Sequence, residues 1–215
     1  MIPGPVILYA VFAILYVVFL VWYGGKGKPL TQAEVDAFMA DIKRAAGVDP
    51  NSAENHNLKE LRELAKSDDG GEYYMLNLQK FRKKALYKNG GEHKGGDALA
   101  ADKRYNRTVI PLLIKHGGLP FFSTKVMGRF IHPEGSEDWD HVAMVRYRSR
   151  RDNLKMVVDL ARKRGDKDKW AALEKTQVFP LKPLVSLITV RMTIGLILFF
   201  IATLLHLALS GLKVY

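Results

Sequence analysis

The chain has 215 residues, a formal net charge of +11 and no cysteine. The absence of cysteine excludes thiol catalysis and thiolate metal sites, and it agrees with a reducing compartment. Basic residues outnumber acidic ones, 33 to 22, which favours contact with an anionic surface such as the inner leaflet of a membrane.

Two long stretches without acidic or basic residues lie near the ends of the chain. The first, 5–23, is long enough for a helix of roughly 28 Å and ends in a Trp-Tyr pair, which is typical of an interfacial aromatic belt. It lacks the basic start and the cleavage site of a signal peptide. The second, 192–210, contains one histidine and no Asp, Glu, Lys or Arg. We predict an N-terminal transmembrane helix, 1–23, and a C-terminal transmembrane helix with its tail, 182–215.

The basic residues around these stretches predict an orientation. Lys26 and Lys28 follow the first stretch, Lys182 and Arg191 precede the second, and only Lys213 lies beyond it. The positive-inside rule therefore predicts a two-pass protein of the bacterial inner membrane, with a cytoplasmic central domain and both termini in the periplasm. Membrane lipids are an expected partner of the basic central domain.

The segment 24–70 is predicted to be a membrane-proximal linker with two helices. The first helix, 30–47, begins with Thr31 and Glu34 at the spacing of a capping box and ends at a glycine. The second is a short helix at 58–66, after a turn-rich stretch.

The central segment 71–181 alternates strand and helix signals in the order β-α-β-β-α-β. This order is the split βαβ arrangement of ferredoxin-like domains, so the predicted class is α+β, with this domain between the two transmembrane helices. Pro111 is expected to kink the first helix. The predicted elements are a strand at 72–81, a helix at 97–116, strands at 119–131 and 139–147, a helix capped by Ser149 and Asp152, a short helix at 167–175 and a strand at 176–181.

Several blocks of this segment are similar to a known family. In order they are YYMLNLQKFR at 73–82, ALY at 85–87, Tyr105 with PLL at 111–113, KHGG at 115–118, WDHV at 139–142, VRYRSR at 145–150 and LEKT at 173–176. Together they resemble an uncharacterised branch of small bacterial proteins in the dimeric α/β-barrel superfamily. The resemblance implies a ferredoxin-like domain that associates through its open sheet face. The superfamily also contains monooxygenases, isomerases and haem enzymes, so the fold implies no single activity.

Two amides on the first strand are candidate ligand-binding groups. Asn77 and Gln79 share a strand face with Tyr73, Met75 and Phe81, because side chains alternate along a strand. They point to a pocket in the barrel, or else they hydrogen-bond backbone or a second protomer. We also predict an apolar open sheet face that carries Tyr73, Met75, Met144 and Phe121 or Phe122.

Three further side chains are candidates for chemistry. Tyr105 and His116 lie on one face of the predicted helix 97–116, and His116 is a candidate general base. The alternative is that His116 stabilises the helix C-terminus. Arg146 is a candidate for binding a carboxylate or phosphate. The alternative is that Arg146 pairs with an acidic residue across a dimer interface.

No motif for a metal site, a phosphate loop or a nucleophile elbow is found in the sequence. We therefore expect neither a metal nor a cofactor. The basic runs near residues 80–84, 146–151 and 162–164 are interpreted as contacts with anionic lipid or an acidic partner, not with nucleic acid.

The second apolar stretch carries a stripe of small and polar residues that includes Gly195, Ala202 and His206. Such stripes are typical of helix–helix interfaces in membranes, so we expect His206 to face another helix. Haem ligation by His206 from two protomers is an alternative.

These observations favour a non-enzymatic accessory or scaffold subunit of an inner-membrane complex. Its cytoplasmic domain would form a homodimer or dock on another integral membrane protein complex. The alternative is an α/β-barrel enzyme of the monooxygenase or isomerase class that acts on a lipophilic small molecule at the membrane.

Overall fold

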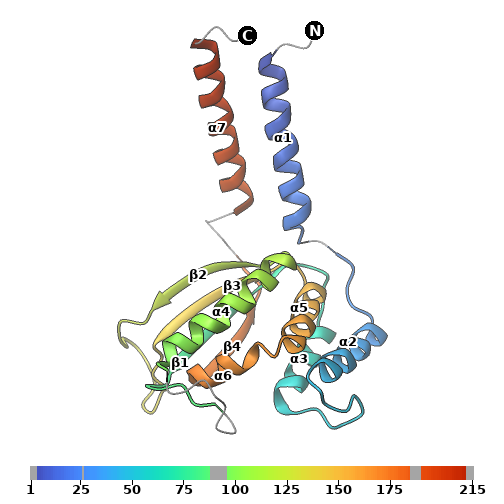
Figure 1. Ribbon diagram of the computed structural model, residues 1–215, viewed down its shortest axis with the longest axis vertical. Helices are drawn as coiled ribbons and strands as arrows, with labels where there is room; N and C mark the ends of the chain where they lie inside the picture. Colours follow the sequence, from blue (N-terminus) through green and yellow to red (C-terminus); the bar gives the residue numbers. More distant parts are fainter. Residues whose placement is uncertain (1–3, 26, 88–95, 185–189, 212–215) are drawn as a thin grey trace. The chain divides into compact units, whose positions relative to one another are not determined.

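The computed structural model describes residues 4–25, 27–87, 96–184 and 190–211. The chain divides into two compact units: a globular unit, Gly25–Lys182, and a helix pair formed by the residues before and after it. Figure 1 shows the elements of both.

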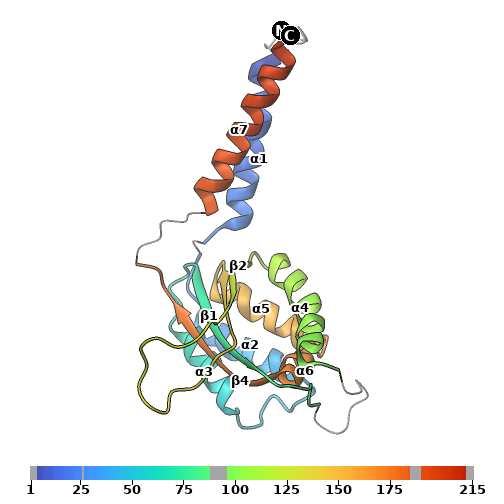
Figure 2. The ribbon, with the colours of Figure 1, turned by 90° about the vertical axis from the view of Figure 1, so that its left-hand side faces the viewer.

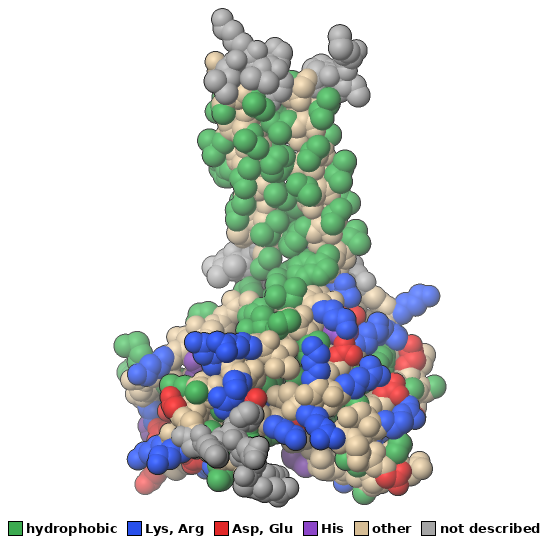
Figure 3. Space-filling view, in the orientation of Figure 1, with side chains coloured by type: hydrophobic (Ala, Val, Ile, Leu, Met, Phe, Trp, Pro, Cys, Tyr) green, Lys and Arg blue, Asp and Glu red, His purple; other side chains and the backbone are tan. Residues whose placement is uncertain are grey.

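The helix pair consists of α1 (Gly4–Tyr23) and α7 (Val190–Gly211). Both helices are long and apolar enough to cross a membrane, with mean hydropathies of 2.6 and 2.4. In Figure 3 apolar side chains cover the visible surface of both helices, whereas Lys and Arg gather on the globular unit. The two predicted apolar stretches are thus helices of the expected length.

Two helices precede the sheet, α2 (Gln32–Ala45) and α3 (His56–Lys66). The capping box is present, because the Thr31 side chain accepts from the Glu34 N–H while Glu34 accepts from the Thr31 N–H. Both helices contribute to a core with α5 (Arg150–Arg162). They belong to the globular unit. The buried members of this core are Val35, Met39, Ile42, Ala65, Leu154 and Val158.

The remaining elements build a four-stranded antiparallel sheet in the order β2-β3-β1-β4 and the helices packed on it. Figure 2 shows α4 and α5 on the same side of the sheet. The strands are β1 (Tyr73–Phe81), β2 (Leu119–Lys125), β3 (His141–Tyr147) and β4 (Leu173–Leu181), and the helices α4 (Ala98–Lys115) and α6 (Asp166–Ala172) complete the unit.

Two element boundaries differ most from the sequence prediction. The strand predicted at 119–131 ends at Lys125, because β3 starts only at His141 and offers little pairing beyond it. The helix predicted to reach 175 ends at Ala172, and the residues that follow pair with the end of β1 as the start of β4. Pairing with a neighbouring strand outweighs the local helical preference there.

The register decides which side chains face the helices. Tyr73 lies opposite Tyr147, with ring centroids 5.4 Å apart, and its hydroxyl accepts a 2.7 Å hydrogen bond from Asn153 of α5. Tyr73 and Met75 therefore face the helices, and the prediction that they form the open face is wrong. The open face carries the alternate residues of β1, Tyr74 and Leu76.

Candidate functional site

His116 and Tyr105 are held in different contacts. His116 is the C-cap residue of α4, and its Nε2 lies 3.0 Å from Oδ2 of Asp159 on α5. Tyr105 lies in the middle of α4 under the Lys169 ammonium of α6, which is 5.8 Å from the ring centroid. Each candidate thus joins α4 to a different neighbouring helix. His116 thus lies at the helix terminus, and its ring contact is with a carboxylate of α5.

Asn77 makes hydrogen bonds within the sheet. Its amide nitrogen donates to the carbonyl oxygens of Met75, at 3.2 Å, and Ala143, at 3.4 Å. This is the structural alternative for Asn77, since both amide protons meet backbone acceptors.

Arg146 forms an internal ion pair. Its side chain is fully buried, and it donates to Glu72 at 2.9 and 2.5 Å and to the Gly117 carbonyl at 3.0 Å. The guanidinium ties the residue before β1 to the turn after α4. Sequence reasoning missed Glu72 because it lies 74 positions from Arg146.

Gln79 belongs to a polar group that spans three strands. Its Oε1 lies 2.8 Å from Nδ1 of His141, and Nε2 of His141 lies 2.9 Å from Oγ of Ser123. The register places the three residues on the helix-facing side of β1, β3 and β2. His141 was predicted to lie in the strand 139–147, but only the pairing of the strands brings it to Gln79 and Ser123.

Two charged residues from the covering helices complete this group, which we call the Lys169 cluster (Gln79, Asp102, Ser123, His141 and Lys169). Asp102 of α4 accepts a 2.8 Å hydrogen bond from Asn106. Burial raises the pKa of the Asp102 carboxyl and lowers the pKa of the Lys169 ammonium. The described residues contain no group of acidic or histidine side chains arranged to hold a metal.

The open face of the sheet has an apolar row across all four strands. Leu76 of β1 pairs with Met144 of β3 and Phe179 of β4, and Met144 pairs with Phe122 of β2. Phe122 and Phe179 are 53% and 44% exposed. We call these four residues the apolar row.

The connection between β2 and β3 adds exposed apolar side chains. Met127, Phe130 and Ile131 are 101%, 96% and 87% exposed. Figure 2 shows this connection extending on the side of the sheet away from α4. We call residues 126–140 the arm. Arg129 and Asp138 form an ion pair within it.

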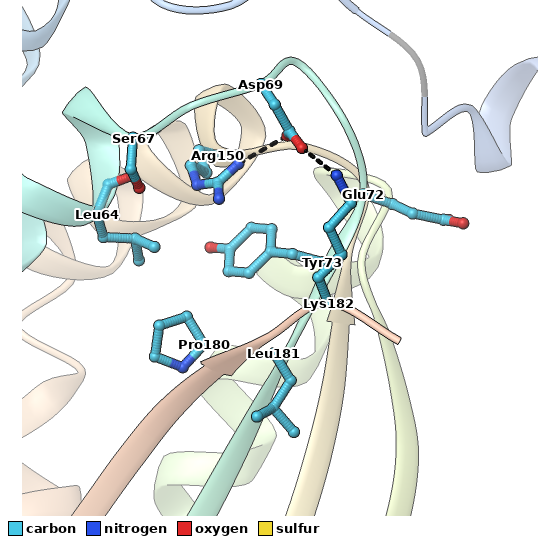
Figure 4. A pocket seen from close by; sticks show the side chains of 9 residues that line it. All are labelled: Leu64, Ser67, Asp69, Glu72, Tyr73, Arg150, Pro180, Leu181 and Lys182. Carbon is cyan, nitrogen blue, oxygen red and sulfur yellow. Dashed lines mark hydrogen bonds and ion pairs between the residues drawn. The ribbon is translucent and has the colours of Figure 1, made fainter. Parts of the chain in front are cut away.

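A small pocket of about 150 Å³ lies where β1 begins and β4 ends. Figure 4 shows the Asp69 carboxylate between Arg150 and Lys182, which pair with it at 2.9 and 2.6 Å. Arg150 also lies over the Tyr73 ring, 5.2 Å from its centroid. The pKa of Asp69 lies below its usual range, mainly because of the hydrogen bond from the Lys182 ammonium and to a smaller extent because of the one from Arg150. Asp69, Arg150 and Lys182 thus pair with one another inside the pocket. These contacts hold the start of β1 next to the end of β4.

The residues predicted for a membrane helix interface lie between α7 and α1. A Cβ added at Gly195 would stand 3.1 Å from Cζ of Tyr16, and Ala202 is fully buried. The rings of His206 and Tyr9 have centroids 5.7 Å apart. The stripe therefore faces the other helix of the same chain.

Sequence reasoning missed a second link in this pair. The guanidinium of Arg191 lies 4.6 Å from the Tyr23 ring centroid and donates a 2.7 Å hydrogen bond to the Gly24 carbonyl. Tyr16 donates to the Arg191 carbonyl at 3.0 Å. The signal for this link was the basic residue at the start of the second apolar stretch.

Fold and helix pair together define a class: an α+β protein with two apolar helices able to span a membrane. No protein-family model matches the sequence, and no curated protein matches it either. A crystal structure of a protein of unknown function from Rhodopseudomonas palustris is similar, with a TM-score of 0.53 and 26% identity over 63% of this chain and 97% of that chain. The methylated form of that protein has a TM-score of 0.54 at 26% identity, over 64% of this chain and 96% of the other.

Proposed function

We propose that this protein is a non-enzymatic accessory subunit of a bacterial inner membrane, anchored by α1 and α7, whose globular unit docks through the open face of its sheet. The strand order, with β1 and β3 central, supports a ferredoxin-like domain of the dimeric α/β-barrel type. The candidate catalytic residues His116 and Tyr105 and the candidate ligand-binding residue Arg146 lie in separate packing contacts, which favours docking over chemistry at these positions.

The apolar row carries this proposal. A sheet with one face packed on helices leaves its other face to be covered or solvated, and soluble monomers rarely expose large contiguous apolar patches. Here the row crosses the whole sheet without a charged residue. An exposed Phe at each edge strand marks both ends of the row.

The occupant we propose for this face is a second copy of the chain. A chain with a net charge of +11 repels itself over most of its surface, so two copies approach best through an uncharged face. A two-fold axis would place the same row on both sides of the interface. The arm lies beside the same face and offers Phe130 and Ile131 to the partner.

The full-length protein in detergent micelles tests this proposal by multi-angle light scattering. We expect a dimer, and we expect Phe179→Glu to weaken dimerisation at least about tenfold, the scale of burying one charge in an apolar contact. Val178→Glu is the matched control, because Val178 is the neighbouring residue on β4, 38% exposed, and faces the other side of the sheet. A monomeric parent, or equal effects of the two variants, would refute self-association.

The proposed orientation has its own test. The chain has no cysteine, so a single cysteine in place of the exposed Asn51 reports on one side of the membrane only. We expect a membrane-impermeant maleimide to leave it unlabelled in intact cells and to label it after lysis. Labelling in intact cells would place the globular unit outside.

A further inference from the structure

The last turns of α4 present apolar and basic side chains away from the rest of the globular unit. Ile110 and Ile114 are 37% and 44% exposed, and Arg107 is exposed as well. The three residues share one side of the helix, because they follow one another at intervals of three and four residues. Asp102, the acidic residue of α4, belongs instead to the Lys169 cluster. We call Arg107, Ile110 and Ile114 the α4 face; it combines apolar surface with a positive charge.

Internal contacts tie this end of α4 to the point where the chain enters the globular unit. The Gly25 carbonyl accepts a 3.2 Å hydrogen bond from the Glu72 N–H. The Glu72 carboxylate accepts from Arg146, which also donates to the carbonyl of Gly117, just beyond α4. Since α1 ends at Tyr23, only two residues, roughly 7 Å of extended chain, separate it from Gly25. If α1 spans a membrane, the C-terminal end of α4 is therefore held near the membrane surface.

The basic run 146–151, by contrast, is largely neutralised within the globular unit. Its arginines Arg146, Arg148, Arg150 and Arg151 each form an ion pair with an acidic residue. A guanidinium that already binds a carboxylate is less available to a phosphate. The predicted lipid contact of this run is thus weaker than its sequence indicates.

We propose that the α4 face rests on the anionic headgroups of the membrane that α1 and α7 span. Ile110 and Ile114 enter the interfacial layer, where burial of apolar surface favours binding, and Arg107 meets lipid phosphates. The inference rests on the proposed anchoring of the protein. It is independent of self-association, because α4 covers the side of the sheet opposite the apolar row (Figure 2).

Fluorescence quenching in the full-length protein tests this contact. The protein, which has no cysteine of its own, is placed in nanodiscs of phosphatidylglycerol and phosphatidylcholine that contain a lipid with a nitroxide on its headgroup. We expect a fluorophore on Ile114→Cys to be quenched. Leu99→Cys is the matched control, because Leu99 is an exposed apolar residue of the same helix, roughly 22 Å away along its axis. Quenching at position 114 no stronger than at position 99, or unchanged in phosphatidylcholine alone, would overturn the proposal.

Charge reversal separates this surface from the net charge of the protein. Fluorescence lifetimes give the ratio of quenched to unquenched molecules labelled at position 114. Arg107→Glu should lower this ratio at least about fivefold, the scale of one basic residue near an anionic surface. Lys59→Glu, at an exposed position of α3, changes the net charge equally and should leave the ratio unchanged. Equal effects of the two variants would contradict a specific contact of the α4 face.

The same experiment distinguishes a failure of this contact from a failure of the anchoring. A protein that does not enter the nanodiscs would refute anchoring by α1 and α7, and the contact with it. An inserted protein without quenching at position 114 would refute the lipid contact alone and would favour an acidic protein as the partner of the α4 face.

Discussion

His116 and Asp159 connect the C-terminus of α4 to the middle of α5, with Nε2 and Oδ2 3.0 Å apart. Lys115 approaches the same carboxylate to 2.7 Å. Because α4 and α5 cover one face of the sheet together, this contact helps to fix the spacing of the helix layer.

Asp159 should make the free energy of unfolding depend on pH in the acidic range. Hydrogen bonds lower the pKa of Asp159 to about 2, and the one from Lys115 contributes more than the one from His116. An unperturbed aspartate has a pKa of about 3.9. The folded state therefore binds fewer protons than the unfolded state between these values, so the stabilisation is complete above about pH 4 and is lost as the pH falls towards 2. We expect Asp159→Asn to cost about 1 kcal/mol at pH 6 and little near pH 2, measured by urea unfolding.

The His116 side chain should matter less than Asp159. His116→Gln keeps the Lys115 contact, so we expect a loss of at most about 1 kcal/mol, with dimerisation unchanged. Light scattering and urea unfolding of the same preparation check both expectations. A folded His116→Gln protein that lost its cellular role while still assembling would favour an enzyme over a docking subunit.

The ion pair of the buried Arg146 and the half-buried Glu72 should be strongly coupled. Removing one partner leaves a charge in an environment that disfavours it, so Glu72→Gln should destabilise the globular unit by roughly 3 kcal/mol. The double variant with Arg146→Met should cost less than the sum of the single variants, because no buried cation remains. Additive losses in this double-mutant cycle would show that the ion pair contributes nothing specific.

Two tyrosine hydroxyls provide a matched comparison. Tyr73 accepts a 2.7 Å hydrogen bond from buried Asn153, so Tyr73→Phe leaves that amide without its partner and should cost about 1–3 kcal/mol. Tyr105 makes no hydrogen bond within the described residues, so Tyr105→Phe should be nearly neutral in urea unfolding. Equal losses would mean that ring packing, not the hydroxyl, determines both.

The helix pair should be sensitive to side-chain size at one glycine of α7. Gly195→Ile would press against Tyr16, whereas a Cβ at Gly211 meets nothing within 4 Å. We expect Gly195→Ile to slow disulfide formation between cysteines introduced at Tyr9 and His206, and Gly211→Ile to leave it unchanged. Equal rates in both variants would show that α1 and α7 do not pack closely in the membrane.

Local signals in the sequence determined most elements of this protein. Two apolar stretches predicted α1 and α7, the capping box of Thr31 and Glu34 marked the start of α2, and Ser149 marked the start of α5. Each signal acts within one or two helical turns, so it is visible in the sequence. The mixed α+β class followed from the order of these elements.

Only the tertiary structure decided which side chains meet. Whether Tyr73 faces helices or the open side depends on the sheet register, and a shift by one residue would reverse it. The partners of Arg146 and His141 lie 74 and 62 residues away, beyond any local pattern. The Tyr105 ring of α4 lies near the Lys169 ammonium only because α4 and α6 pack together. Such contacts form only when the whole chain folds, because strand pairing and burial together determine which side chains meet.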